Sequence, residues 1–467
     1  GVSDGAGATN SLDHQWQLTA AAAPTVSGSG PADGSRDVAI DAPLTIAFSR
    51  AMDATSTARA ISLDPAVPGT SVVRSARDHS RFLVAPGGLL VSAATYRLVV
   101  SPVARDEHGQ PLAAGFSSRF TTGALSAGSH AVVLAAPLGR PPTELLLARP
   151  QAASTSETIP PVPLVLAPSC GPAPASVCNA EAEQSTVSYS AALVSPGGTW
   201  VALVENTAGT PGSTVVRVVQ LATASTVGSF SGASQPSWSP SGRRLAFVTA
   251  AGGVAVFSPQ AGSEQLLPSG APLLRAPLWG ADDDTLILTT SGPSVTPRLE
   301  LANPQLGARY ALPGQPSSAD HSVVSPSGAT LAFAAGQSDG SSALAVLSLV
   351  GAPSAMRVLQ PALVPLAFAD EDTVIATATT PSGTSLVRVS LSGGSPVAIA
   401  LQPPPLDPAG VTVDPVTHLL GYVARDARGV TQAYLASFTG GAARQLTSFS
   451  PRDRAAVSVT FEVPPAG

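Results

Sequence analysis

The stretch Ser237-Trp-Ser-Pro-Ser-Gly-Arg-Arg-Leu-Ala-Phe-Val-Thr249 decides the fold of most of this chain. In it, a turn of the form Ser-Pro-x-Gly separates a tryptophan from a short apolar run. Proline cannot donate to a β-ladder, and glycine adopts the positive φ that many tight turns need. The stretch therefore predicts the turn between the first two strands of a sheet, with Trp238 before the turn and Ser239, Pro240 and Gly242 within it.

The pattern recurs along the chain as an internal repeat. Clear copies contain Ser195-Pro196 and Ser325-Pro326-Ser-Gly328. Weaker copies begin at Gly280, Ala369 and Asp414, and successive copies lie 44, 41, 45, 44 and 45 residues apart. A period of this length with four short strands is typical of a β-propeller blade. Stacking such sheets around an axis buries both faces of each sheet, which one sheet alone leaves exposed.

The number of blades depends on the two ends of the repeat region. Six copies give six complete blades over about 186–450, and strand-like stretches remain before and after them. We predict a propeller over 130–467 with a seventh, closing blade. Its inner strand comes from 456–463, with 457–463 as the core of that strand, and its outer strands come from 130–167. The alternative is a six-bladed ring with extra strands at its periphery.

The N-terminal part of the chain has a different pattern. Residues 1–23 are small and polar and are interpreted as a linker. Residues 24–123 hold short alternating runs, such as Leu44–Phe48 and Tyr96–Val100, separated by Gly and Pro turns. Several short strands at this spacing predict a small antiparallel β-sandwich. The fold class expected for the chain is therefore all-β, a sandwich followed by a propeller.

Two resemblances follow from these stretches. Trp238–Phe247 resembles the WD40-like unit of TolB-type periplasmic propellers, although Ser241 and Ser327 replace the usual Asp. The N-terminal part resembles the bacterial Ig-like module of S-layer and other surface proteins, the SbsA type, which implies a spacer or adhesive unit at the cell surface. The residues that carry this second resemblance are Pro31–Gly34, Val38, Leu44–Ser49, Met52, Asp53, Leu89, Tyr96, Asp106, Gly109, Leu112 and Phe120–Gly123.

Composition excludes several classes of function. The net charge is −6, and all 24 basic residues are Arg scattered singly, so the chain lacks the basic stripe of a nucleic-acid binder. No apolar run reaches 18 residues without interruption. We therefore expect contact with a membrane only through an anchor outside this chain.

The two cysteines, Cys170 and Cys178, lie eight positions apart in a Gly- and Pro-rich segment. A local disulfide is the expected state, and two free thiols are the alternative. A zinc site ranks last, because no His lies nearby to complete the ligand set. A disulfide implies an oxidising compartment.

We predict no catalytic, cofactor-binding or metal-binding residues. Gly336-Gln-Ser-Asp-Gly340 matches the Gly-x-Ser-x-Gly nucleophile elbow, but it falls where a hairpin between two blade strands is expected. The acidic runs 282–284 and 370–372 lie at repeat turns, which favours a turn-forming role over a calcium site. The six His (14, 79, 108, 130, 321 and 418) show no metal-ligand spacing, and Trp200, Trp238 and Trp279 occupy repeat positions suited to blade packing.

These patterns favour a non-enzymatic extracytoplasmic scaffold, at the cell surface, in the periplasm or secreted. Its propeller is expected to bind an envelope or surface protein, and it fits the ectodomain of a membrane-anchored protein. The alternatives are a carbohydrate-binding surface protein and a propeller-type hydrolase or lyase.

Overall fold

The computed structural model describes residues 22–126, 130–149, 162–164, 187–207, 214–291, 296–312, 319–338, 340–350, 356–381, 383–452 and 454–462, together with 3 and 5–7. These residues form β-strands almost throughout, which confirms the expected all-β fold class. The exceptions within this part are a short helix, α1 (Ala54–Ala60), and a single 3-10 turn, η3 (Pro408–Gly410). Cys170 and Cys178, and with them the disulfide prediction, lie outside the described residues.

The N-terminal part is a sandwich of two four-stranded sheets. Alternation along the strands places Leu44, Ile46, Phe82 and Phe120 in its core. The expectation of a purely antiparallel sandwich is wrong at one pair, because β2 runs parallel to β8. The chain crosses from one sheet to the other between β1 and β2 and so enters beside β8 in the same direction. One sheet holds β1 (Val26–Gly30), β3 (Leu44–Phe48), β6 (Arg81–Ala85) and β5 (Ser71–Arg74); the other holds β2 (Ser35–Val38), β8 (Phe116–Thr122), β7 (Thr95–Val100) and β4 (Ile61–Asp64).

Seven four-stranded sheets lie within the described part of 130–462, and each is called a blade below. Six follow one another along the chain. Blade 1 holds β12 (Val187–Val194), β13 (Trp200–Thr207), β14 (Thr214–Gln220) and β15 (Ser225–Ser231); blade 2 holds β16 (Ser234–Trp238), β17 (Leu245–Val248), β18 (Val254–Ser258) and β19 (Ser263–Leu266); blade 3 holds β20 (Leu278–Trp279), β21 (Leu286–Ser291), β22 (Pro297–Asn303) and β23 (Ala308–Ala311). Blade 4 holds β24 (Ala319–Val324), β25 (Thr330–Gly336), β26 (Ser342–Ser348) and β27 (Arg357–Pro361); blade 5 holds β28 (Leu363–Phe368), β29 (Thr373–Thr380), β30 (Gly383–Ser390) and β31 (Val397–Ala398); blade 6 holds β33 (Thr412–Asp414), β34 (Leu419–Arg425), β35 (Thr431–Ser437) and β37 (Arg444–Gln445).

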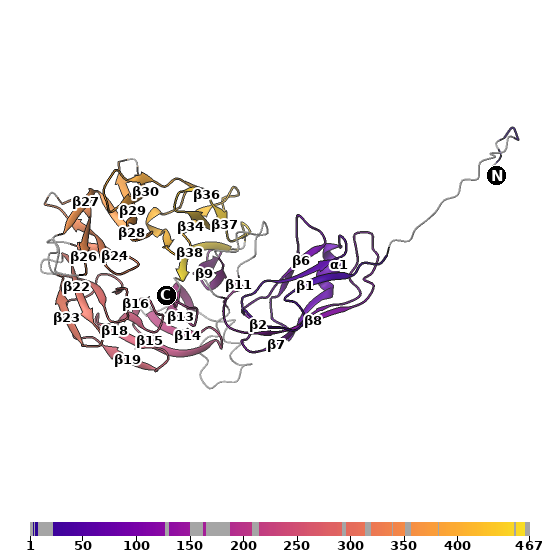
Figure 1. Cartoon of the computed structure of the whole chain (residues 1–467), viewed down its shortest axis with the longest axis horizontal. Helices are drawn as coiled ribbons and strands as arrows, with labels where there is room; N and C mark the ends of the chain where they lie inside the picture. The colour runs from indigo at the N-terminus through magenta and orange to yellow at the C-terminus, as the bar shows by residue number, and fades with distance from the viewer. Residues whose placement is uncertain are drawn as a thin grey trace.

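The remaining sheet, the closing blade, joins the two ends of this region. β38 (Arg454–Glu462) pairs antiparallel with β9 (His130–Pro137), which is followed outward by β10 (Glu144–Ala148) and β11 (Val162–Pro163). The innermost strand of every blade also contacts the innermost strand of the next, from β12 through β16, β20, β24, β28 and β33 to β38, which in turn contacts β12. The blades therefore form a closed ring, with β38 near the centre and β19, β23 and β27 along the rim (Figure 1).

Apolar faces hold neighbouring blades together. Between blades 1 and 2, the ring of Phe230 packs against Phe247 at 4.5 Å and Phe257 at 4.9 Å between centroids. The second strand of blade 4 is buried at all but its end residues, because blades cover both of its faces. This two-sided burial explains why the repeat strands are continuous apolar runs rather than alternating ones.

Side-chain donors also link the innermost strands. The indole N–H of Trp238 donates to the carbonyl of Leu193 in blade 1, and that of Trp279 donates to the carbonyl of Ser237 in blade 2, both at 2.9 Å. At the ring seam, the Thr460 hydroxyl donates to the carbonyl of Ala192 at 3.0 Å. Each of these bonds joins residues near the C-terminal ends of two innermost strands, so these strands run in the same direction. We call the side of the ring at which they end the turn face, and the side at which they begin the start face.

Candidate functional site

The turn face carries the Ser-Pro-x-Gly turns, which pack against the turns of neighbouring blades. The buried hydroxyls of Ser195, Ser239 and Ser325 accept the backbone N–H five residues later, at 3.0–3.2 Å. Gly242 has a φ of +70°, and a Cβ there would lie 2.2 Å from the carbonyl oxygen of Pro196 in the preceding blade. A side chain at Gly242 is thus excluded twice, by backbone conformation and by the neighbouring blade.

The acidic runs connect these turns from one blade to the next. The backbone N–H and hydroxyl of Ser241 both donate to the carboxylate of Asp283, in the following blade. Ser327 does the same with Glu371, at 2.7 Å for each bond. Since Ser replaces the Asp of the related motif at both positions, the carboxylate that caps the turn comes from the neighbouring blade.

The innermost strands bulge between the start face and the turn face, before or near the middle of each strand. In blades 1 and 5 and in the closing blade, one extra residue interrupts the register of the innermost strand: Ser190, Leu366 and Val457. In blades 2 and 4, two residues, 235–236 and 321–322, oppose a single residue on the second strand. Bulges of this kind re-aim side chains and leave backbone groups outside the ladder, and they are common beside binding sites.

Two of the bulged residues have a strained backbone. Gln235 has a φ of 52° and His321 a φ of 50°, both in the left-handed region that non-glycine residues rarely adopt. Such conformations cost on the order of 1–3 kcal/mol and persist where the surrounding structure imposes them. The start face therefore holds two strained polar residues at equivalent places in blades 2 and 4.

His321 belongs to a polar cluster with Asp320 and Arg275. The Arg275 guanidinium donates to both carboxylate oxygens of Asp320, at 2.5 and 2.8 Å, and one of its nitrogens lies 3.3 Å from Nδ1 of His321. Partial burial raises the pKa of the Asp320 carboxyl, but hydrogen bonds from Arg275 and His321 outweigh it, and the pKa lies well below its usual range. Asp320 is therefore an anion at neutral pH, bound to a cation from the preceding blade.

Four of the bulged residues are open to solvent. Ser190 and Gln235 are exposed, the Val457 residue is 45% exposed and the His321 side chain is 40% exposed. These four residues stand on four innermost strands that surround one axis. The arrangement presents hydroxyl, amide, imidazole and aliphatic groups together, which suits recognition of a mixed polar and apolar surface.

A second polar cluster contains Ser126, His130 and Asp41, the three residue types of a hydrolase triad. Nε2 of His130 lies 3.0 Å from the Ser126 hydroxyl and 3.3 Å from the carboxylate of Asp41. A triad requires two different ring nitrogens for these contacts. The Ser126 hydroxyl also donates directly to Asp41, at 2.7 Å, so the geometry is that of a structural network.

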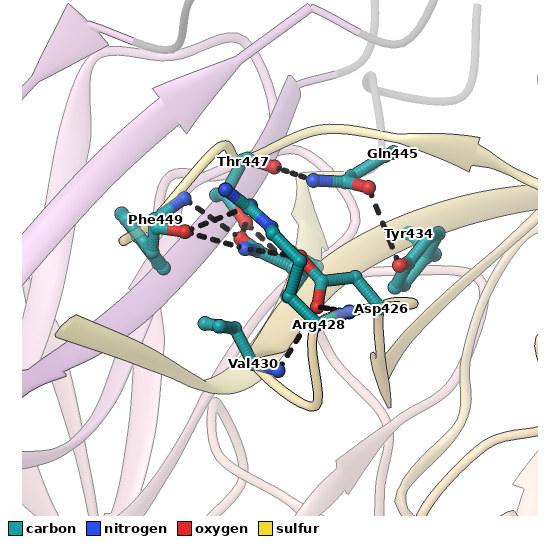
Figure 2. Close-up of polar contacts among 9 residues, drawn as sticks. Asp426, Arg428, Val430, Tyr434, Gln445, Thr447 and Phe449 are labelled. Carbon is teal, nitrogen blue, oxygen red and sulfur yellow. Dashed lines mark hydrogen bonds and ion pairs between the residues drawn. The ribbon is translucent and has the colours of Figure 1, made fainter. Parts of the chain in front are cut away.

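A third network joins blade 6 to the segment that leads to β38, and Figure 2 shows its polar contacts. The side chain of Gln432, 0% exposed, donates to the carbonyl of Phe449 and accepts its N–H, both at 3.0 Å, and accepts the Thr447 hydroxyl at 2.8 Å. Asp426 accepts from Arg428 and from the backbone of Val430 at the edge of the network (Figure 2). Burial raises the pKa of Asp426, but these hydrogen bonds and that of Gln432 together lower it to about 2. The network secures the last connection of the ring.

The other sequence motifs hold no site in the described residues. Gly336 ends β25 and Gly340 lies just before β26, so this motif joins two strands and not a strand and a helix as an elbow requires. Within the described ranges, no group of three or more His, Cys, Asp or Glu is arranged to hold a metal ion. The same ranges contain no helix long and apolar enough to cross a membrane.

Sequence reasoning treated the six histidines singly and missed the contact of His321 with Arg275. The two residues are 46 positions apart, in the connection before β20 and at the start of β24. One signal was present: Asp320-His321 lies shortly before the Ser325 turn, within the strand that the repeat predicts to be innermost. The carboxylates of Asp283 and Glu371 lie about one repeat after Ser241 and Ser327, and this spacing could also be recognised in the sequence.

Comparison with known proteins divides the chain in the same way. Residues 20–122 match the family model described as the bacterial Ig-like domain. This part of the chain is a bacterial Ig-like domain. The match confirms the resemblance expected for the N-terminal sandwich, called the Ig-like domain below. The chain matches no curated protein.

Several solved structures are similar to the propeller. TolB from Acinetobacter baumannii is 13% identical, with a TM-score of 0.40 over 59% of this chain and 66% of that one. The β-propeller domain of the Trilobed protease from Pyrococcus furiosus is 11% identical, with a TM-score of 0.43 over 56% and 86%. Oligogalacturonate lyase from Vibrio parahaemolyticus is 11% identical, with a TM-score of 0.42 over 55% and 77%. At these scores the ring architecture of this chain rests on its own strand pairing.

Proposed function

We propose that this chain is a non-enzymatic, extracytoplasmic binding protein whose propeller holds a protein partner at the start face. One observation carries the proposal: solvent-exposed, bulged residues stand on four of the innermost strands around one axis. Backbone groups released from the ladder at a bulge can bind an extended peptide, and the mixed side chains beside them can select it. An envelope or surface protein is the expected partner, in keeping with the Ig-like domain.

The tryptophans favour protein over carbohydrate as the ligand. Sugar sites commonly need an aromatic face open to solvent, but Trp238 and Trp279 use their indole N–H groups to bind the preceding blade. Trp200 packs against the apolar cluster between blades 1 and 2. The described tryptophans therefore serve blade packing, and a carbohydrate site would have to be built from other residues.

An enzyme is the second candidate, since the similar structures include a lyase and the propeller domain of a protease. It would need a nucleophile or acid–base pair exposed at the start face. The Arg275–Asp320–His321 cluster offers an imidazole, but its carboxylate is neutralised by the guanidinium. The binding proposal therefore fits this face better than catalysis.

Replacing the strained residues by glycine tests the proposal with little cost to the fold. Glycine adopts a positive φ freely, so Gln235→Gly and His321→Gly remove the side chains and relieve backbone strain. Envelope extract from the source organism is passed over the immobilised full chain and over the double variant. We expect one protein to be retained by the wild type and its retention to fall at least tenfold in the variant.

A photo-crosslinking amino acid at Gln235 or Val457 then places the contact. The matched control carries the same group at Val397, which is also exposed but lies on the outermost strand of blade 5. Adducts at the two inner positions and none at Val397 support the proposal. Equal labelling at all three positions, or retention of glycan alone, refutes it.

A further inference from the structure

A polar cluster connects the Ig-like domain to the closing blade. It consists of Asp41, Ser126, His130 and Arg149 and is called the joint below. Asp41 lies just before β3, and its carboxylate accepts the Arg149 Nε–H at 2.6 Å, across 108 residues of chain. The same carboxylate accepts the backbone N–H and hydroxyl of Ser126, at 3.0 and 2.7 Å, and lies 3.3 Å from His130. One carboxylate thus binds the Ig-like domain to two strands of the closing blade, because His130 begins β9 and Arg149 follows β10.

The joint is buried, so its charges depend on one another. The side chain of Asp41 is 2% exposed and that of His130 is 1% exposed. Burial raises the pKa of Asp41, but hydrogen bonds from His130, Arg149 and Ser126 outweigh it and hold the pKa well below its usual range. Removing one member of a buried ion pair leaves the other uncompensated, which is strongly destabilising.

Apolar side chains extend the same contact. Leu89 of the Ig-like domain and Leu125 of the connection pack against a cluster that contains Val132 and Leu134 of β9 and Leu145 and Leu147 of β10. This cluster continues into blade 1 through Leu203 and Val219. The Ig-like domain therefore packs against β9 and β10 through Leu89 as well as binding the ends of these strands.

The joint lies where the ring is closed. His130 is the backbone partner of Glu462, the last described residue of β38, and β38 is paired within its blade only with β9. The closing blade is thus assembled from two distant parts of the chain. Pairing of β38 with β9 requires both strands to be ordered, and ordering each residue of backbone costs about 1–2 kcal/mol.

We propose that the Ig-like domain is the clasp of the propeller: by binding the ends of β9 and β10 and packing against them it orders the template on which β38 closes the ring. The domain expected from its family to act as a spacer then has a second role within its own chain. The joint lies at the turn-face end of the closing blade, so it leaves the start face open. This inference is independent of the partner proposed for the start face.

Amide hydrogen exchange in the full chain, followed by mass spectrometry, tests the clasp. In Asp41→Ala we expect amides of β9 and β38 to exchange at least tenfold faster than in the wild type, while β25 and β26 on the far side of the ring keep their rates. Glu264→Gln is the control, a carboxylate lost from the exposed strand β19. It is expected to change neither region.

Three results overturn the clasp. They are unchanged exchange in β9 and β38, faster exchange confined to the Ig-like domain, and an equal increase in every blade. If Asp41→Ala does not fold, Arg149→Met is measured in its place, because it removes one donor at a partly exposed position and leaves Ser126 and His130 beside the carboxylate. The same tenfold criterion applies to that variant.

Discussion

Replacing Gln432 by Leu should weaken the whole ring, because this amide satisfies several buried groups at once. The substitution keeps the side chain's size but removes its oxygen, which accepts the Phe449 N–H at 3.0 Å and the Thr447 hydroxyl at 2.8 Å. Each buried polar group left without a partner costs about 1–3 kcal/mol. The carbonyl of Phe449 keeps its bond from Arg428, at 3.1 Å. Two lost partners therefore predict a fall of about 2–6 kcal/mol in the free energy of unfolding.

Urea denaturation followed by far-ultraviolet circular dichroism measures this change. The control is Gln360→Leu, since the Gln360 amide donates an exposed hydrogen bond to the carbonyl of Gly394 at 2.9 Å. It should cost less than about 1 kcal/mol. If Gln432→Leu costs no more than Gln360→Leu, the network in Figure 2 does not secure the connection to β38, and the reasoning from buried unsatisfied groups is refuted.

Three further outcomes are expected. Trp238→Phe should cost about 1 kcal/mol beyond its lost packing area, because the bond to Leu193 disappears; equal stability in chemical denaturation would contradict the link between blades. In a double-mutant cycle, Ser327→Ala and Glu371→Gln should couple by about 0.5–1 kcal/mol, and additive effects would show that the carboxylate does not cap the turn of the neighbouring blade. The pKa of Asp426 is lowered to about 2, so its contribution to stability is complete above its unfolded pKa of about 3.9 and is lost as the pH falls toward 2. Unfolding free energies measured from pH 5 to 2 should therefore fall more steeply in the wild type than in Asp426→Asn, and parallel curves would exclude this role.

Much of the architecture could be predicted from short stretches of the sequence. The turn at Ser239–Gly242 predicts where two strands meet, because proline and glycine act through the backbone of their own residues. The repeat spacing predicts sheets that cannot bury their faces alone, and the described residues form a ring of such sheets. The strand-like stretches before and after the six repeats predicted that the two ends of this region pair with each other, and β38 pairs with β9.

Sequence patterns did not predict contacts between residues that are far apart along the chain. The parallel pairing of β2 with β8 depends on how the chain crosses between two sheets. The acidic run at Asp283 was predicted to form its own turn, and the structure adds that it caps the turn of the preceding blade through Ser241. No spacing predicts that Asp41 meets Arg149.

What the amino-acid sequence alone determined was the class of structure: short strands, tight turns, a repeated sheet and an N-terminal Ig-like domain. Each of these follows from backbone conformations and apolar patterns within a few residues. Only the tertiary structure decided which polar groups meet: around His321, around Gln432 before β38, and at the joint around Asp41. The contacts at His321 and Asp41 join different blades or domains, and those at Gln432 join blade 6 to the connection that follows it, so their geometry exists only in the folded chain.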